Sequence, residues 1–164
     1  MMPKKQPVDW ATFFLAFSRD GSFSNPDAKP YLSKKTSYTI GVYDQDEAAE
    51  FYGFNPAENR FHREQIEKYP EQYLFIKSTF HGDYHSILLS FLDSTWTDDK
   101  KLKMLVKDCY LNSIGGWLKN IRSNNQIDID PELIIDSWHR FKNDELNILM
   151  EKYLIDNNIN FYWI

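Results

Sequence analysis

The chain has 164 residues, of which 42% are apolar and 16% aromatic, and it carries a formal net charge of -5. This length and apolar content exclude a wholly disordered chain and predict one globular domain over residues 8–164, preceded by a disordered segment over residues 1–7. The acidic balance repels nucleic-acid phosphates, so we do not expect nucleic acid as the default partner.

The first part of the chain predicts a helix, a loop and a β-hairpin. Asp9 can cap a helix over 9–19, in which aromatic residues recur at helical spacing. Glycine, serine, asparagine and proline gather in 20–30 and predict a loop. Alternating residues over 31–43, around a polar turn at 33–36, are typical of a β-hairpin.

An isolated hairpin is barely stable in water, so this one must pack on helices or gain a third strand. Two segments could supply that strand, namely 73–77 and the terminal run 160–164. The choice between them stays open at this point.

Two short helices follow the hairpin in the prediction. An acidic segment over 46–52 is expected to form one helix, ended by Gly53 and Pro56. A second helix is expected over 58–69, where Pro70 stops it.

The second half of the chain is predicted to be helical. Apolar residues with helical spacing indicate core-facing helices over 81–93, 97–109 and 113–121. From Pro131 onward the stripe changes phase, which allows either two helices broken near Asn143 or one long bent helix. We therefore predict a mainly helical α+β domain, with a hairpin or three-stranded antiparallel sheet packed on five or six helices.

Several segments resemble, in their order, an uncharacterised family of small acidic bacterial proteins. The family's patterns are YLDxxTGEV, then a strand followed by ExYxxMxxF, then GxGAFRxFK, and finally a tryptophan followed three residues later by phenylalanine. The family has no assigned activity, so the resemblance implies an architecture and no function. The similar segments here are Tyr31–Thr39, Glu71–Ile76 with Asp83–Phe91, Ser113–Ile121, and Trp138–Phe141.

Two histidines come nearest to a metal site. His81 and His85 are one helical turn apart, with Asp83 between them. Two imidazoles do not complete a ligand set, and histidines are common on helix surfaces. We therefore predict no metal and no cofactor, and keep the two histidines as weak candidates.

The sequence carries no standard signature of an enzyme. Cys109 is the only cysteine and lies on an apolar helical stripe, which favours a buried, unreactive thiol. Phosphate-binding loops, dinucleotide fingerprints and nucleophile elbows are missing from the sequence. We predict no catalytic residue, and a dispersed, unrecognised active site is the second alternative for the function.

Lysines make one predicted helix basic. They could bind phosphate or an acidic protein together with Lys119 and Arg122, although lysines on an amphipathic helix usually form its solvated face. A nucleic-acid-associated regulator is therefore the first alternative function. The lysines are Lys100, Lys101, Lys103 and Lys107.

The aromatic content suggests a binding surface. Twenty-seven aromatic side chains are many for a core of this size, so some are expected at the surface. The terminal residues either pair as a buried strand, which we favour, or form a patch for a partner or a second copy of the chain. These residues are Phe161, Tyr162, Trp163 and Ile164.

Together these observations predict a cytoplasmic bacterial protein that acts by protein-protein contact. No apolar stretch is long enough for a signal peptide or a membrane-spanning helix, so no membrane partner is expected. An immunity, inhibitor or regulatory protein fits an acidic chain without a reactive motif. Delivery to another cell by other signals stays open.

Overall fold

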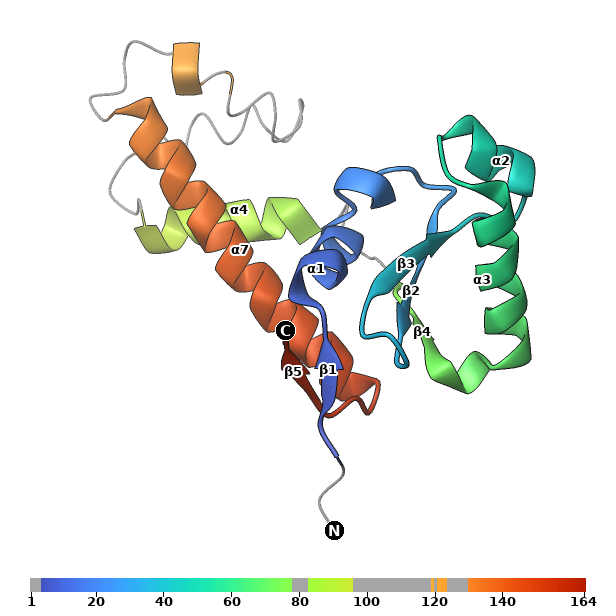
Figure 1. The fold of residues 1–164 in the computed structure, drawn as a ribbon. Helices are drawn as coiled ribbons and strands as arrows, with labels where there is room; N and C mark the ends of the chain where they lie inside the picture. The colour runs from blue at the N-terminus through green and yellow to red at the C-terminus, as the bar shows by residue number, and fades with distance from the viewer. Residues whose placement is uncertain (1–3, 78–82, 96–118, 120, 124–129) are drawn as a thin grey trace. The chain divides into compact units, whose positions relative to one another are not determined.

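A computed structural model describes residues 4–77, 83–95, 119, 121–123 and 130–164. It combines helices with two small sheets (Figure 1), which confirms the predicted α+β class. The contacts divide the chain into two compact units, Met1–Ser78 with Leu149–Ile164, and Thr79–Ile148. We call them the first and the second unit.

The first unit contains the predicted hairpin, extended to three strands. Strands β2 (Lys29–Ser33) and β3 (Thr39–Val42) are antiparallel, and β4 (Tyr73–Phe75) pairs with the other edge of β2. The strand order is therefore β3-β2-β4. Of the two segments proposed for the third strand, the one around residues 73–77 supplies it.

The terminal run forms a separate sheet. Strand β5 (Phe161–Trp163) pairs in parallel with β1 (Gln6–Val8), and Gln6 N donates to Asn160 O at 2.8 Å. The prediction of disorder over 1–7 is therefore wrong at Gln6 and Pro7. This strand is held by hydrogen bonds to residues at the far end of the sequence, which leave no local signal.

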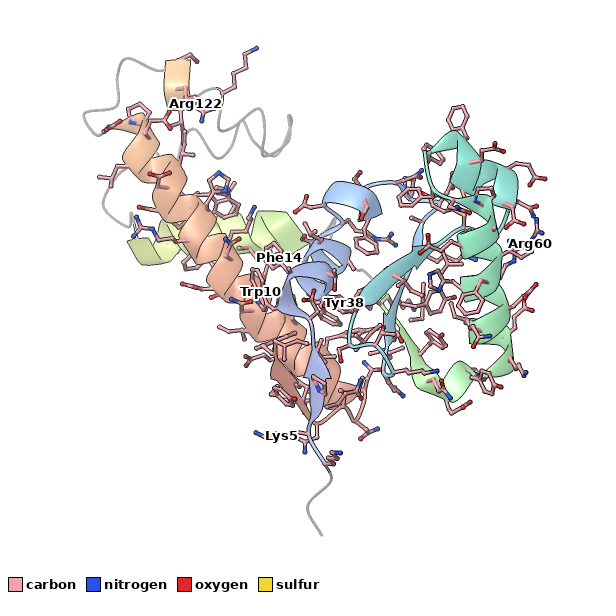
Figure 2. The ribbon with its side chains drawn as sticks, in the orientation of Figure 1. Lys5, Trp10, Phe14, Tyr38, Arg60 and Arg122 are labelled. Carbon is pink, nitrogen blue, oxygen red and sulfur yellow. The ribbon has the colours of Figure 1, made fainter. Side chains whose placement is uncertain are left out.

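Helix α1 (Trp10–Ser18) begins where the sequence predicts. Asp9 Oδ2 accepts a hydrogen bond from Thr12 N at 2.8 Å, which caps the helix. Trp10 and Phe14 stack at 4.8 Å along one side of it (Figure 2), while Phe13 is fully buried on another. Inside the predicted loop lies a short 3₁₀ helix, η1 (Gly21–Phe23).

Helices α2 (Asp46–Phe51) and α3 (Pro56–Lys68) follow the hairpin, and the 3₁₀ helix η2 (Pro70–Gln72) leads into β4. We expected Pro56 to end a helix, whereas it begins α3. Proline fits the first position of a helix because that N–H has no partner within the helix. Asn55 Oδ1 caps α3 by accepting from Ala57 N at 2.9 Å.

The three-stranded sheet has two different faces. Since side chains alternate along strands, Leu32, Thr39 and Gly41 belong to one face, and Tyr31 and Ile40 to the other. We call these the core face and the groove face. Helices α1 and α3 lie on opposite sides of this sheet, α3 on the side of Ile40 (Figure 1).

The core of the first unit gathers on the core face and around α1. Leu32 is fully buried, and a side chain at Gly41 would meet the ring of Phe23. The end of α7 (Pro131–Asp156) joins this core, since Tyr153 contacts the ring of Phe17 edge-on at 5.7 Å. Other residues of the first unit with no exposed surface are Val8, Phe13, Ala16, Ala49, Ile76, Met150 and Leu154.

The second unit contains α4 (Asp83–Thr95) and most of α7. Phe91 is fully buried and lies 5.6 Å from the ring of Trp138 and 5.5 Å from that of Phe141. Helix α7 continues past Asn143, which decides between the two alternatives in favour of one helix.

None of the helices in the described residues is both long and apolar enough to cross a membrane.

Candidate functional site

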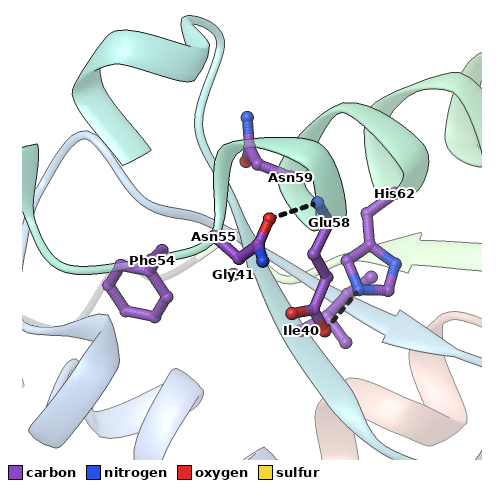
Figure 3. A pocket seen from close by; sticks show the side chains of 7 residues that line it. All are labelled: Ile40, Gly41, Phe54, Asn55, Glu58, Asn59 and His62. Atoms are coloured by element: carbon purple, nitrogen blue, oxygen red, sulfur yellow. Dashed lines mark hydrogen bonds and ion pairs between the residues drawn. The ribbon is translucent and has the colours of Figure 1, made fainter. Parts of the chain in front are cut away.

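A groove runs beside α3 on the groove face of the sheet. Two hollows, of about 170 and 240 Å³, share Ile40 and His62 in their linings and so adjoin one another. Figure 3 shows the first of them, with Phe54 on one side and Glu58 and His62 on the other. We call both hollows together the α3 groove. Its lining residues are Ser33, Lys35, Thr36, Ile40, Gly41, Phe54, Asn55, Glu58, Asn59, Phe61, His62, Gln65 and Tyr73.

Helical spacing explains how α3 lines the groove. Glu58, His62 and Gln65 are separated by four and three residues, which places them on one side of the helix. His62 Nε2 lies 3.6 Å from Glu58 Oε1. A dashed line marks this contact in Figure 3. Ile40 of β3 is the apolar residue that both hollows share. The groove therefore combines an apolar floor with a polar helix side.

A set of polar contacts, which we call the polar latch, helps to hold α3 to the end of β3. Val42, on the same face of β3 as Ile40, is buried as well. Asn59 is the only buried residue of α3. Its Oδ1 accepts from Tyr43 N at 2.8 Å, and its Nδ2 donates to Tyr43 O at 3.0 Å and to Asp46 Oδ1 at 3.0 Å. Asn59 thus pairs with the backbone just after β3 as a neighbouring strand would.

Two arginines of α3 complete this latch around Asp46. Arg60 Nε donates to Asp46 Oδ2 at 2.8 Å, and Arg63 Nη1 lies 3.2 Å from Asp46 Oδ1. Figure 2 labels Arg60, which projects from α3. The hydrogen bond from Asn59, followed by the one from Arg60, lowers the pKa of Asp46. These hydrogen bonds favour the ionised carboxylate, so Asp46 serves structure.

Aromatic side chains are unusually exposed around α2 and α3. Phe51, at the end of α2, keeps 82% of its surface exposed, and Phe61 on α3 keeps 56%. Tyr52 and Phe54 in the connection between the helices are 46% and 38% exposed. We call these four residues the α2–α3 aromatic surface. Phe54 and Phe61 also line the α3 groove, so surface and groove are continuous.

A buried tyrosine supports two of the exposed rings. Tyr43 is almost fully buried and packs in a small cluster with Ala28 and Ala49. Tyr52 stacks on its ring at 5.7 Å, and Phe54 lies 5.4 Å from it at an interplanar angle of 45°. Phe51 in turn contacts the ring of Tyr52 edge-on at 5.0 Å. The rings of Tyr52 and Phe54 are therefore held in place by packing against Tyr43, and the ring of Phe51 contacts that of Tyr52.

The chemistry of this site suits binding. In the residues that the structure describes, no group of three or more histidine, cysteine, aspartate or glutamate side chains could hold a metal ion. The titratable side chains that line the groove are Glu58, His62, Lys35 and Tyr73. Aromatic rings, one carboxylate and one imidazole can receive side chains of another molecule.

The terminal aromatic residues were expected to pair as a buried strand, and the structure agrees with this in part. They do pair as a strand, and Phe161 and Trp163 are half-buried, with Trp163 lying 5.8 Å from the ring of Phe13. Tyr162, however, is 47% exposed. Ile164 is 57% exposed as well, so the run divides between packing and exposed surface.

The other predicted site residues cannot be placed. Lys100, Lys101, Lys103, Lys107, Cys109 and His81 lie outside the described residues, and of His85 only the backbone in α4 is described. Arg122, expected to join the lysines, forms an ion pair with Glu132 at 3.0 Å.

Sequence reasoning missed the α2–α3 aromatic surface. Two features of the sequence could have indicated it. Phe61 is an aromatic residue inside a helix whose other residues are nearly all polar, and the aromatic sequence Phe51-Tyr52-Gly53-Phe54 stands at the end of the acidic helix α2. Because α3 has no apolar stripe, its aromatic residue has no core to enter.

Comparison with protein-family models, with curated proteins and with solved structures finds no match for this chain. The resemblance to an uncharacterised family of small acidic proteins therefore stays a prediction.

Proposed function

We propose that this protein acts in the cytoplasm by binding another protein through the α2–α3 aromatic surface, as an immunity, inhibitor or regulatory protein. The observation that carries the proposal is the exposure of Phe51, at 82%, and of Phe61, at 56%. Burying a phenylalanine side chain contributes about 1.5–3 kcal/mol. Leaving several such rings in water is unfavourable unless a partner covers them.

The packing beneath the rings supports the same proposal. Interface residues that dominate affinity are typically aromatic side chains held rigidly near the centre of a patch. Tyr43 holds Tyr52 and Phe54 in this way, so little side-chain entropy is lost when a partner binds. The surface is thus preorganised for contact.

Each hollow of the α3 groove, taken by itself, is smaller than a usual small-molecule site. Small-molecule sites usually measure about 300–1,000 Å³. The two hollows measure about 170 and 240 Å³, so each is suited to one or two inserted side chains. A larger hollow of about 470 Å³ is lined by residues of one continuous stretch, 155–161, at the end of α7, and contains no titratable side chain.

The proposal is tested by partner capture from the source bacterium. The tagged full chain is compared with the double variant Phe51→Ala/Phe61→Ala, because both side chains are exposed and their loss should leave stability within about 0.5 kcal/mol. We expect a stoichiometric partner on the original chain and its loss from the double variant.

The matched control is Leu133→Ala/Ile148→Ala, since these residues are 51% and 59% exposed on α7. The control should retain the partner. Retention of the partner by the phenylalanine variant, or its loss from both variants alike, would contradict a role for the α2–α3 aromatic surface.

A further inference from the structure

The negative charge of the chain is concentrated in the segment that carries the proposed surface. The segment 44–71 contains eight acidic and three basic residues, a net charge of -5, which equals that of the whole chain. The rest of the chain has sixteen acidic and sixteen basic residues, so its net charge is zero. This segment includes α2, α3 and the four residues of the α2–α3 aromatic surface.

The basic residues of this segment are mostly engaged internally. Arg60 and Arg63 both contact the carboxylate of Asp46. Lys68 lies 5.2 Å above the ring of Tyr69. Outside the segment, Lys29 pairs with Asp44 at 2.7 Å.

Two exposed acidic side chains of this segment have no lysine or arginine partner within the described part of the chain. Glu50 directly precedes Phe51 and is exposed, and among the described residues no lysine or arginine forms an ion pair with it. Glu58 keeps 69% of its side chain exposed at the groove, and its ion-pair partner there is His62, at 3.6 Å. One uncompensated carboxylate thus precedes Phe51 in the sequence, and another lines the α3 groove together with Phe54.

Both components of this surface attract the same class of side chain. Carboxylates attract arginine and lysine by charge, and aromatic faces attract them through cation-π contacts of about 0.5–1 kcal/mol at exposed sites. The stems of these side chains are apolar and can lie against Phe51 or Phe61. An acidic partner segment would meet repulsion at the same place.

We propose that the segment of the partner that covers the α2–α3 aromatic surface is basic and apolar, with an arginine or lysine entering the α3 groove beside Glu58. The inference rests on the proposed function and adds the chemistry of the partner to it. The groove hollow of about 170 Å³ next to Glu58 has room for one long side chain.

The test uses three labelled peptides and the full chain. One peptide alternates leucine and arginine, and matched peptides carry glutamine or glutamate in place of arginine. Fluorescence anisotropy should show the arginine peptide binding at least about tenfold more tightly than the glutamate peptide, with weaker binding as salt rises from about 50 to 200 mM.

Two double variants that change the net charge equally test where the arginine peptide binds. Glu50→Gln/Glu58→Gln should weaken binding of the arginine peptide about fivefold, as expected for two exposed charge contacts. Asp136→Asn/Asp144→Asn on α7 makes the same change in net charge within the second unit and should leave affinity within about twofold. Thermal melting of each variant verifies that it is folded.

The outcomes separate this inference from the proposed function. If all three peptides bind equally and Phe51→Ala/Phe61→Ala weakens each of them, the aromatic surface stands and the basic partner is refuted. Absence of arginine-peptide binding, or equal weakening by both charge variants, also refutes it, while partner capture still decides the proposed function. Selective binding that only Glu50→Gln/Glu58→Gln weakens supports the inference.

Discussion

The two faces of the three-stranded sheet are covered in different ways. On the core face, Leu32 is fully buried and the ring of Phe23 packs against Gly41, so apolar contact excludes water. On the groove face, α3 buries only Asn59 and is held by hydrogen bonds to Tyr43 and Asp46. Exposed rings and a groove remain beside that polar latch.

The face that stabilises the fold and the face that is available to a partner are therefore different. A face closed by apolar packing has no surface to offer a partner, whereas a helix attached through a few polar contacts leaves apolar side chains uncovered. Hydrogen bonds also set the position of α3 more strictly than apolar contact would, because they demand specific distances and angles. This is the arrangement expected of a rigid binding surface.

The largest expected effect comes from truncating the core face. Leu32→Ala should lower the free energy of unfolding by about 3 kcal/mol, because the side chain is fully buried and its removal leaves a cavity. Ile40→Ala, one position from the strand end on the groove face, should cost about 1 kcal/mol since Ile40 is already partly exposed. Urea unfolding measures both.

Both strand substitutions should be checked for an unchanged dependence of the free energy on urea concentration. A changed slope would mean that the variant alters more than stability. Equal losses at Leu32 and Ile40 would show that the two faces are packed alike, against the comparison drawn above.

The second effect concerns the polar latch. Asn59→Ala should destabilise the first unit by about 2 kcal/mol, because it leaves Tyr43 N and O without the partners that Asn59 provides. Hydrogen exchange at Tyr43 should accelerate. Glu64→Ala, an exposed position on the same helix, serves as control and should change stability by less than about 0.5 kcal/mol.

A smaller effect is expected at the edge that both faces share. The Tyr153 hydroxyl accepts from Lys77 N at 3.0 Å and donates to Phe75 O at 2.9 Å, so it satisfies the backbone along the outer edge of β4. Tyr153→Phe should cost about 1 kcal/mol and speed hydrogen exchange at Lys77. Unaltered exchange there would show that water replaces the hydroxyl without loss.

Local patterns were sufficient to predict the elements of the core face. Asp9 marks the start of α1, and the alternation in 31–43 predicts the hairpin, because each signal lies within a few neighbouring residues. The strand pairing of Gln6 with Phe161 was missed, since it joins segments that share no local pattern. Pro56 was misjudged because proline both ends and begins helices.

The candidate site was less accessible to sequence reasoning than the fold. The aromatic excess suggested that some rings reach the surface, but the terminal run was the one aromatic segment considered for a binding patch, and its burial was favoured. Phe161 and Trp163 are half-buried, whereas Tyr162 is exposed. Exposure of Phe51 depends on how α2 ends and how Asn59 positions α3, and both are tertiary features. The sequence alone does not reveal that α3 docks through a polar residue.

The smallest effect tests whether charge contributes to the polar latch. The hydrogen bond from Asn59 and then that from Arg60 lower the pKa of Asp46 from its ordinary value of 3.8. The folded state therefore gains stability above about pH 4 and loses it as the pH falls through the lowered pKa, since the unfolded chain binds the proton more readily there. Asp46→Asn should flatten the stability profile below about pH 4, measured by urea unfolding between pH 2.5 and 7. A stability profile identical to that of the original chain below about pH 4 would mean that the ionised carboxylate of Asp46 adds nothing to the polar latch.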